Sequence, residues 1–309
     1  MPGSPRLPWR DLPDTVRRTI EDHVGVVTEA VNATSGFSPG LAARCRLASG
    51  ETVFIKSVST DQNPISPGMH RHEARVAAQF PAGLPAPRLR QVFDDGHYVT
   101  LIYDCIDGHN PTIPWAADEL TATLAALEDI SRWTVPSPVA GLVPMTELLA
   151  DEFDGWSRLA EVDASDIDPW FHDHLDELVG WERAFFEIDH GDALVHLDVR
   201  SDNLVIDTTG QIWLVDWANA ALGDPWVDLA AMLPSVTMEG GPPAAALWAR
   251  SRFDATTNTD DLTAFVVAMA GMFTQRSRTP PPPGIPTLRT FQEAQAGPAR
   301  DWVRHLLDP

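Results

Sequence analysis

The stretch HLDVRSDNLVI, residues 196–206, carries the strongest chemical signal in this sequence. A Thr-Gly turn at residues 209–210 follows it, and a second apolar run then leads into Asp216. Two apolar runs joined by such a turn are typical of a β-hairpin, which returns the chain beside its own start. The pattern therefore predicts that Asp198, Asn203 and Asp216 come together at one place.

Phosphoryl transfer needs three polar groups of these kinds. One carboxylate orients the attacking hydroxyl and accepts its proton, while an amide oxygen and a second carboxylate hold magnesium against the phosphates. The order along the chain gives the first task to Asp198 and the metal to Asn203 and Asp216. An Asp-Asn pair before a turn can equally be an ordinary loop, so the interpretation depends on a second set of residues.

The segment resembles the aminoglycoside phosphotransferase branch of the protein-kinase-like fold. Members of that branch carry His-Gly-Asp-x4-Asn and then a hydrophobic-Asp-aromatic triplet, which here is Val215-Asp216-Trp217. Leu197 stands where the family has glycine. The resemblance implies that His196 orders the loop. It also implies that Arg200 contacts the transferring phosphate and stabilises its charge in the transition state; the alternative is a surface arginine paired with Asp202.

A near match lies just upstream of this loop. His190-Gly191-Asp192 reproduces the family tripeptide letter for letter, but the residue five positions after Asp192 is Leu197 rather than asparagine. The residue five positions after Asp198 is Asn203. We therefore place the catalytic loop at His196, and we expect Asp192 to be a solvated or loop-bonding acid.

The second set of residues begins with Lys56, which is the only lysine in the chain. It closes an apolar, strand-like run at 52–56, and an alternating run at 41–47 and the small-residue segment 34–40 precede it. This order resembles the nucleotide-binding lobe of kinases, in which such a lysine meets the α- and β-phosphates. An arginine-rich composition would thin out lysines in any case, but this one stands where the fold needs a compact ammonium.

Glu73 is the expected partner of Lys56. It lies within an apolar stripe of a helix predicted at 69–80, and a buried carboxylate needs a partner. The resemblance implies the Lys–Glu pair of the kinase fold. The alternative is a partly exposed Glu73 that pairs with Arg71 or Arg75.

Two further stretches would meet the nucleotide through their backbones. The amides of Ser35 and Gly36 would cover the phosphates, although a plain turn is about equally compatible with these residues. Two short strands at 89–93 and 98–103 lead to an acidic, glycine-containing break that resembles the interlobe hinge of the family. The base would bond to the backbone there, near Asp104 and Ile106, and such contacts leave no side-chain signature that would favour ATP or GTP.

Helical periodicity dominates the rest of the chain. Gly223 to Ala230 resembles a family segment in which Asp228 anchors the catalytic loop, the alternative being an ordinary acid at a helix start. A proline run at 280–283 predicts a stiff linker between the last two helices. The predicted helices span 118–133, 145–160, 170–188, 243–251, 260–277 and 287–307.

Length and composition suit a two-lobed protein of 309 residues. We expect an N-terminal extension with a helix at 1–25, a nucleotide-binding lobe at 26–104 and a helical lobe with the acceptor pocket at 105–309. The sequence shows no secretory signal and no membrane-spanning run. Two cysteines without zinc spacing favour a reducing compartment, so we expect a cytoplasmic protein that is a monomer or homodimer.

The net charge of −22 disfavours nucleic acid and anionic membranes as partners. Acids are dense between residues 147 and 192, a stretch that contains fifteen Asp and Glu residues and only two arginines. In the resembled family this region lines the acceptor pocket, so a cationic acceptor would be attracted there. A solvated acidic face explains the same composition equally well.

Together these patterns predict an α+β, protein-kinase-like fold. Its N-lobe would be small and mostly antiparallel β with one key helix, and its C-lobe larger and mainly helical. The predicted function is transfer of a phosphoryl group from magnesium-bound ATP or GTP to a hydroxyl of a small molecule, such as an amino-containing antibiotic. The alternatives are a metabolite kinase of the amino sugar, choline or homoserine type, and a catalytically idle nucleotide-binding regulator. A missing protein-kinase glycine loop and Ala-Pro-Glu segment disfavour a protein kinase.

Overall fold

The computed structural model describes residues 6–34, 36, 39–162, 166–282 and 285–308. Its contacts divide the chain into two compact units. The first unit contains residues 1–110, 202–219 and 281–287, and the second contains 111–201, 220–280 and 288–309. Both units are assembled from separate stretches of chain. The sequence predicted two lobes made of continuous segments, and those lobe boundaries stay a prediction.

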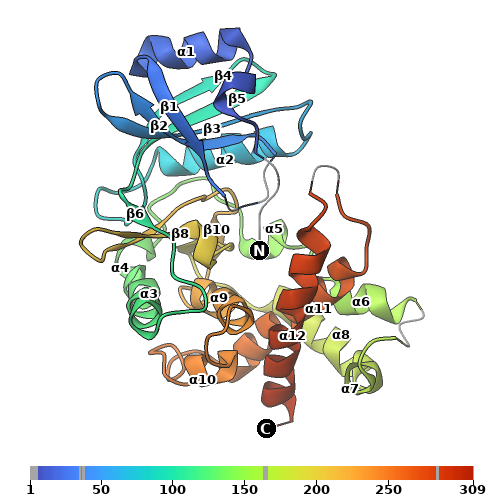
Figure 1. Ribbon diagram of the computed structural model, residues 1–309. Coiled ribbons are helices and arrows are strands. Elements are labelled where there is room, and N and C mark those ends of the chain that lie inside the picture. The colour runs from blue at the N-terminus through green and yellow to red at the C-terminus, as the bar shows by residue number, and fades with distance from the viewer. Residues whose placement is uncertain (1–5, 35, 37–38, 163–165, 283–284, 309) are drawn as a thin grey trace. The chain divides into compact units, whose positions relative to one another are not determined.

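The first unit is built on a five-stranded antiparallel sheet with the order β1-β2-β3-β5-β4 (Figure 1). Tight turns join its hairpins, and Gly50 and Gly96 adopt positive φ values of 89° and 88° there. All four strands predicted for this sheet at 41–47, 52–56, 89–93 and 98–103 are present. The strands are Val27–Asn32 (β1), Leu41–Leu47 (β2), Thr52–Ser59 (β3), Leu89–Asp94 (β4) and Tyr98–Asp104 (β5).

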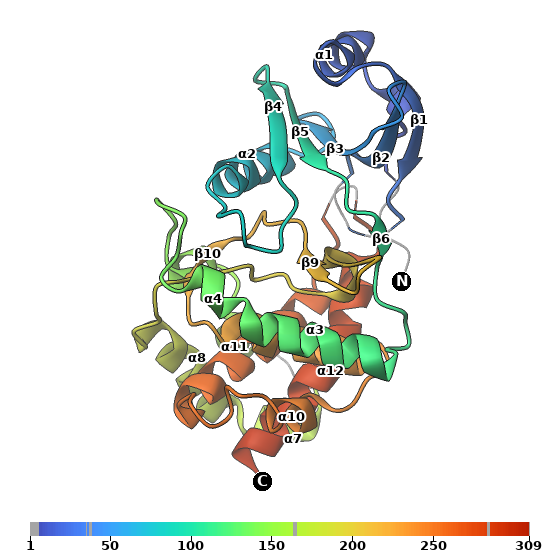
Figure 2. The same cartoon turned by 90° about the vertical axis from the view of Figure 1, so that its left-hand side faces the viewer.

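A helix packs against each face of this sheet. Side chains alternate between the two faces of a strand, so Val53 and Ile55 join a core with helix α1 (Asp14–Val24), which contributes Val16 and Ile20. Phe54, between them, packs on the opposite face with Ala74 and Ala77 of helix α2 (Ser66–Ala77). Figure 2 shows the two helices on either side of the sheet. Lys56 therefore faces α2.

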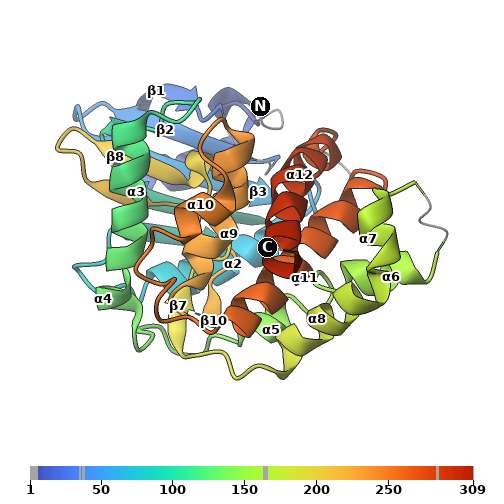
Figure 3. The same cartoon turned by 90° about the horizontal axis from the view of Figure 1, so that it is seen from below.

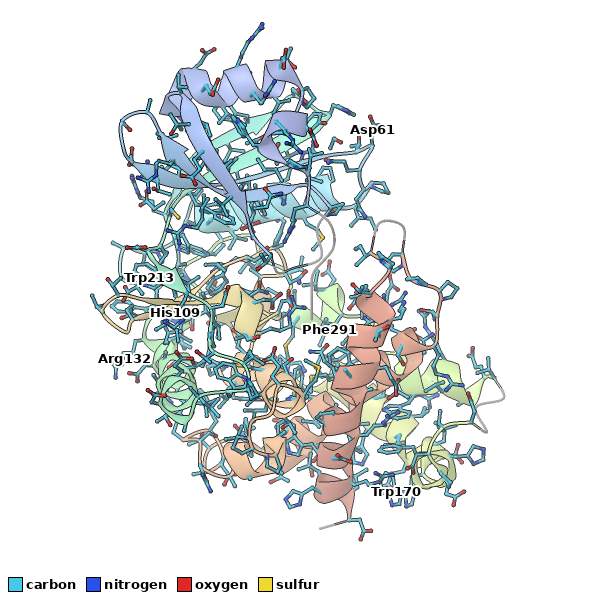
Figure 4. The ribbon with its side chains drawn as sticks, in the orientation of Figure 1. Asp61, His109, Arg132, Trp170, Trp213 and Phe291 are labelled. Atoms are coloured by element: carbon cyan, nitrogen blue, oxygen red, sulfur yellow. The ribbon has the colours of Figure 1, made fainter. Side chains whose placement is uncertain are left out.

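A second, three-stranded sheet in this unit holds the predicted hairpin. Strands β6 (Gly108–His109), β8 (Leu204–Asp207) and β9 (Ile212–Leu214) are ordered β6-β8-β9, and Leu204 lies opposite Leu214. The carboxylate of Asp207 accepts hydrogen bonds from the Thr209 and Gln211 amides at 2.8 and 3.0 Å, which fixes the turn. Figure 4 marks His109 and Trp213 on the two outer strands.

The second unit is mainly helical. Helix α11 is buried along Leu262–Gly271, and it packs against α12, α8 and α6. In Figure 3, α12 runs between α11 and the pair α9 and α10. Strands β7 (Ala193–Val195) and β10 (Ala221–Gly223) form a short antiparallel pair. The helices are Ala117–Asp129 (α3), Ser131–Thr134 (α4), Met145–Leu148 (α5), Gly155–Ala160 (α6), Pro169–Asp173 (α7), Leu175–Glu187 (α8), Val227–Met238 (α9), Ala244–Trp248 (α10), Thr259–Ser277 (α11) and Leu288–Leu307 (α12).

The prediction of one helix over 145–160 is wrong, because the chain forms two short helices with a break at 149–154. The carboxylate of Glu182, which is buried on α8, accepts hydrogen bonds from the amides of Trp156 and Ser157 at 2.7 and 2.9 Å. It thereby satisfies two of the amides that begin α6 and have no partner within that helix. The predicted helices at 118–133 and 170–188 are likewise each divided in two, at Ile130 and His174.

Two smaller features lie near the start and in the middle of the chain. Residues Trp9–Asp11 form a 3₁₀ turn before α1, and Ser201–Asn203 form another before β8. Across the described ranges, none of the helices combines the length and apolar character needed to cross a bilayer.

Candidate functional site

A cavity of about 280 Å³ lies within the first unit. Its walls come from the ends of β1 to β3, from α2, from the segment after β5 and from the β8–β9 hairpin. Ser35 lies outside the described residues. The other predicted nucleotide and metal residues all line this cavity: Gly36, Lys56, Glu73, Asp104, Ile106, Asn203 and Asp216.

Lys56 lies between two carboxylates in this cavity. Its Nζ is 2.8 and 3.0 Å from the two oxygens of Glu73 and 2.8 Å from Oδ1 of Asp216. The Glu73 side chain is only 3% exposed, whereas that of Asp216 is 40% exposed. Arg71 and Arg75, the alternative partners of Glu73, instead bond Asp94 and His72.

The surroundings of Lys56 decide its charge. Burial lowers the pKa of Lys56, but Asp216 and Glu73 outweigh burial, so its pKa lies above the ordinary value. Burial raises the pKa of Glu73, and Lys56 and the Tyr103 hydroxyl, which donates to Oε1 at 3.0 Å, only partly offset that rise. Lys56 is therefore a cation at neutral pH, as a phosphate ligand must be.

Asp216 lies just beyond β9, where the backbone leaves the strand. Its φ of 68° is in the left-handed region, which aspartate adopts at lower cost than most residues other than glycine. Trp217 follows with its indole Nε1 donating to the Leu214 carbonyl at 3.0 Å and its ring against Phe80. This turn ends the strand early and aims the Asp216 carboxylate at Lys56.

Asn203 is brought to the same cavity by the hairpin register. The Val215 amide donates to the Asn203 carbonyl at 3.0 Å, and the asparagine is 5% exposed. Mg²⁺ takes oxygen ligands and is held by one or two carboxylates together with substrate phosphates. Asn203 and Asp216 supply oxygens of these kinds to one cavity, and Asp202 lines it too. Within the described residues there is no cluster of three or more His, Cys, Asp or Glu side chains that would hold a metal unaided.

Residues 196–201 of the predicted catalytic loop lie in the second unit, around a fully buried His196. The Asp198 amide donates to Nδ1 of His196 at 3.2 Å. Asp228, in the first turn of α9, accepts hydrogen bonds from the amides of His196 and Leu197 at 2.8 Å each. Burial raises the pKa of Asp228, while His196 and the two amides act in the opposite direction. Asp228 therefore anchors the loop, as its place in the sequence predicted.

Asp198 has a cation beside it. Nη1 of Arg200 lies 3.2 Å from Oδ1 of Asp198, and the two side chains are 15% and 29% exposed. The Arg200 guanidinium also lies over the ring of Phe291 on α12, 5.3 Å from its centre (Figure 4 marks Phe291). Because Arg200 is held between Asp198 and the Phe291 ring, it restricts the orientation of the Asp198 carboxylate.

The upstream near match has a structural task. Nδ1 of His190 lies 2.9 Å from the Asp224 carboxylate and Nε2 lies 2.9 Å from the Phe185 carbonyl. The Gly191 amide also bonds Asp224, at 3.2 Å. Asp192 is exposed, as expected, and its carbonyl accepts from the Ser137 amide.

Two supporting residues were missed in the sequence. The side-chain amide of Asn110 donates to the Leu204 carbonyl at 2.7 Å and thereby ties the hairpin to β6. In the second unit, Glu239 accepts from the Ser201 hydroxyl at 2.5 Å and from the Trp115 indole at 3.0 Å. All three contacts join residues far apart in the chain, so no local pattern signals them.

Leu197 adopts a φ of 60°, at the place where the resembled family has glycine. A left-handed conformation costs a residue with a side chain roughly 1–2 kcal/mol. We expect Leu197→Gly to be more stable than Leu197→Ala by about 1 kcal/mol, because both remove the leucine side chain but only glycine relieves the backbone. Urea unfolding of the two variants measures this difference, and equal stabilities would contradict a strained backbone at this residue.

Three features define the protein-kinase-like fold: the five-stranded sheet with its Lys–Glu pair, the β8–β9 hairpin and the helical second unit. A sequence profile of the phosphotransferase enzyme family (APH) matches residues 64–262, more than half of the chain. The chain belongs to that family. None of the curated proteins matches it in sequence.

Solved structures of similar fold include several small-molecule kinases. A thermostable mutant of aminoglycoside phosphotransferase APH(4)-Ia in its apo form is 17% identical, with a TM-score of 0.64 over 95% of this chain and 100% of that one. An aminoglycoside-3'-phosphotransferase of type VIII is 20% identical, with a TM-score of 0.53 over 78% and 92%. Choline kinase LicA from Streptococcus pneumoniae is 11% identical, with a TM-score of 0.59 over 96% and 100%.

Proposed function

We propose that this phosphotransferase moves the γ-phosphoryl group of a magnesium-bound ATP or GTP to a hydroxyl of a small molecule. The observation that carries the proposal is the Lys56 ammonium, held between Glu73 and Asp216 in a cavity that Asn203 also lines. A charged lysine, a carboxylate and an amide oxygen together match what nucleotide phosphates and their metal require.

On the donor side, Lys56 binds the phosphates and Glu73 holds Lys56 in place. Asn203 and Asp216 hold Mg²⁺, which neutralises charge on the phosphates when bound. The base contacts the backbone between Asp104 and Ile106. Gly36 leaves room for the phosphates to approach the backbone of its turn.

On the acceptor side, Asp198 orients the hydroxyl and accepts its proton as the phosphoryl group arrives. His196 and Asp228 hold the loop that carries it. Arg200 contacts the transferring phosphate in the prediction from the resemblance, and its ion pair with Asp198 favours an additional task in orienting that carboxylate.

An amino-containing antibiotic is our first proposal for the acceptor. One structurally similar protein is an aminoglycoside phosphotransferase in a complex with ADP and hygromycin B, and another is a choline kinase. A metabolite kinase of the amino sugar, choline or homoserine type is the second proposal. An idle regulator is disfavoured because a residue of the required type occupies each predicted catalytic position. We further propose that the enzyme works in the cytoplasm as a monomer or homodimer, without nucleic acid or membrane.

A substrate panel tests the proposed reaction. ATP and GTP consumption is measured with purified protein and Mg²⁺ against amino-bearing antibiotics, other antibiotics and small hydroxylated metabolites. Consumption that depends on one acceptor, with a phosphorylated product in the mass spectrum, supports the proposal. Nucleotide binding without turnover on any acceptor favours the idle regulator instead.

Part of the acidic segment at 147–192 has structural work. The Glu182 carboxylate accepts hydrogen bonds from the first amides of helix α6, as described, and Asp154 pairs with Arg158. Asp168 pairs with Arg304 at 2.6 Å. Among the remaining exposed acids of this segment, those of α8 and the loop after it are candidates for attracting a cation: Asp176, Glu177, Glu187, Asp189 and Asp192.

Raising the salt concentration should increase the KM of a cationic acceptor, if the exposed acids attract it, because screening acts within about 10 Å at 0.1 M salt. Replacing Asp176 and Glu177 by amides should have the same effect and leave the nucleotide KM nearly unchanged. Steady-state kinetics at about 0.05 to 0.5 M salt, a range over which screening becomes much stronger, measure the effects of the salt and of the substitutions. A salt-independent KM for the best acceptor would mean that the acidic segment at 147–192 is only a solvated face and does not attract the acceptor.

A further inference from the structure

The segment before α1 is strapped to the turn that precedes β2. The Leu7 amide donates to the Gly40 carbonyl at 3.2 Å, and the side-chain amide of Asn32 donates to the Leu7 carbonyl at 3.3 Å. Leu7 and Trp9 also pack against the core beneath α1. These contacts fix the backbone on which Arg6 stands.

The side chain of Arg6 enters the proposed nucleotide cavity. It lines that cavity together with Lys56, Asn203 and Asp216. Its guanidinium lies against Gly36, on the side where a side chain would begin, since a Cβ added to Gly36 would overlap Nη2 of Arg6. Gly36 has a φ of 83° and belongs to the turn that the sequence predicted to cover the phosphates. Arg6 therefore projects into the space between this turn and the metal-binding side chains.

The charges around Arg6 suit a bound polyphosphate. Burial lowers the pKa of Arg6, and Asp216 and Asp202 act against that lowering, which places both carboxylates within electrostatic reach of it. An arginine side chain stays protonated in proteins. Lys56, another cation that lines the cavity, already faces two carboxylates. A triphosphate bound here would gain a second cation from Arg6.

We propose that Arg6 is a phosphate ligand of the bound nucleotide, delivered to the phosphates by the strap at residues 6–12. A planar guanidinium can meet two phosphate oxygens at once, which an ammonium cannot. The inference rests on the proposed function, because it assumes that this cavity binds the nucleotide. It adds a binding residue from outside the stretch that matches the family, which begins at residue 64.

Titration calorimetry of Arg6→Gln tests the proposal on the full-length protein. Mg²⁺ with ADP or GDP, whichever the wild type binds, should bind the variant about tenfold more weakly, the usual loss when a hydrogen bond to a charged group is removed. The corresponding nucleoside, which lacks phosphates, should bind both proteins equally. Arg6→Lys should recover part of the loss. Arg10→Gln is the matched control, because Arg10 belongs to the same segment and its side chain is 84% exposed.

Each other outcome overturns the proposal. Equal nucleotide affinity for Arg6→Gln and the wild type would mean that Arg6 does not touch the phosphates. Tighter Mg²⁺-nucleotide binding by Arg6→Gln would make Arg6 a counter-ion that competes with the metal. A parallel loss of nucleoside affinity would make the strap a support for the cavity wall. A wild type that binds neither ADP nor GDP would instead refute the proposed function itself, and with it this inference.

Discussion

Asp198→Ala will lower turnover by a factor of about 10² to 10⁴, the usual contribution of a positioned general base. Nucleotide affinity will change little, because the cavity that we assign to the nucleotide is formed by the first unit and Asp198 belongs to the second. Initial rates with the best acceptor from the substrate panel measure the first effect, and calorimetry with Mg²⁺-ADP or Mg²⁺-GDP measures the second.

Asp192→Asn is the matched control for this variant. Asp192 belongs to the upstream near match, is exposed and has no predicted part in the reaction. It should keep most of its activity. Near-normal turnover in Asp198→Ala, or a severe loss in Asp192→Asn, would mean that the catalytic loop has been placed at the wrong histidine.

Lys56→Met should destabilise the protein by about 3–5 kcal/mol, the typical cost of removing one partner from a buried ion pair. Glu73 is left buried without its counter-ion, and the phosphates lose their ammonium. We expect a large loss of nucleotide affinity as well. Urea unfolding measures the stability, and Arg71→Met, which breaks an exposed pair between α2 and Asp94 of β4, should change it little.

The stability cost should depend on pH. Burial already raises the pKa of Glu73, and removal of Lys56 takes away the charge that opposes this rise. A carboxyl whose folded-state pKa is raised favours the folded protein below its ordinary pKa and loses that contribution as the pH rises. The stability gap between wild type and Lys56→Met should therefore narrow as the pH falls from 8 toward 5. The double variant Lys56→Met/Glu73→Gln should recover part of the loss at pH 8. A gap that is constant with pH would argue against an ionised, buried Glu73 in the variant.

Most strands of the large sheet and the Lys56–Glu73 pair could be predicted because their signals are local. Apolar and alternating runs identified four of the five strands of the large sheet, and Lys56 and Glu73 each stood out against the apolar residues around them. The hairpin that carries Asn203 and Asp216 followed from its turn. Its place in the first unit, with residues 1–110, did not follow, because proximity in space between distant segments leaves no trace in the order of residues.

The remaining features depend on partners far along the chain. The break at 149–154 is stabilised by Glu182, more than 25 residues away, and Asn110 bonds a carbonyl 94 residues further on. Arg6 could not be assigned from the sequence, because its position depends on Asn32 and Gly40. The left-handed backbone of Leu197 was equally hidden, although the missing glycine at that position pointed to it.

The assignment of the hairpin at 204–214 to the first unit has an evolutionary consequence. The residues that we assign to the donor, including both proposed metal ligands, belong to one compact unit, while Asp198, the proposed proton acceptor, and the helices around it belong to the other. Along this part of the chain, only the few residues between Asp198 and Asn203 separate the proposed proton acceptor from the first proposed metal ligand. With the acceptor bound by the helical unit, as we propose, we expect substitutions there to change which molecules are phosphorylated and to leave nucleotide binding by the first unit intact.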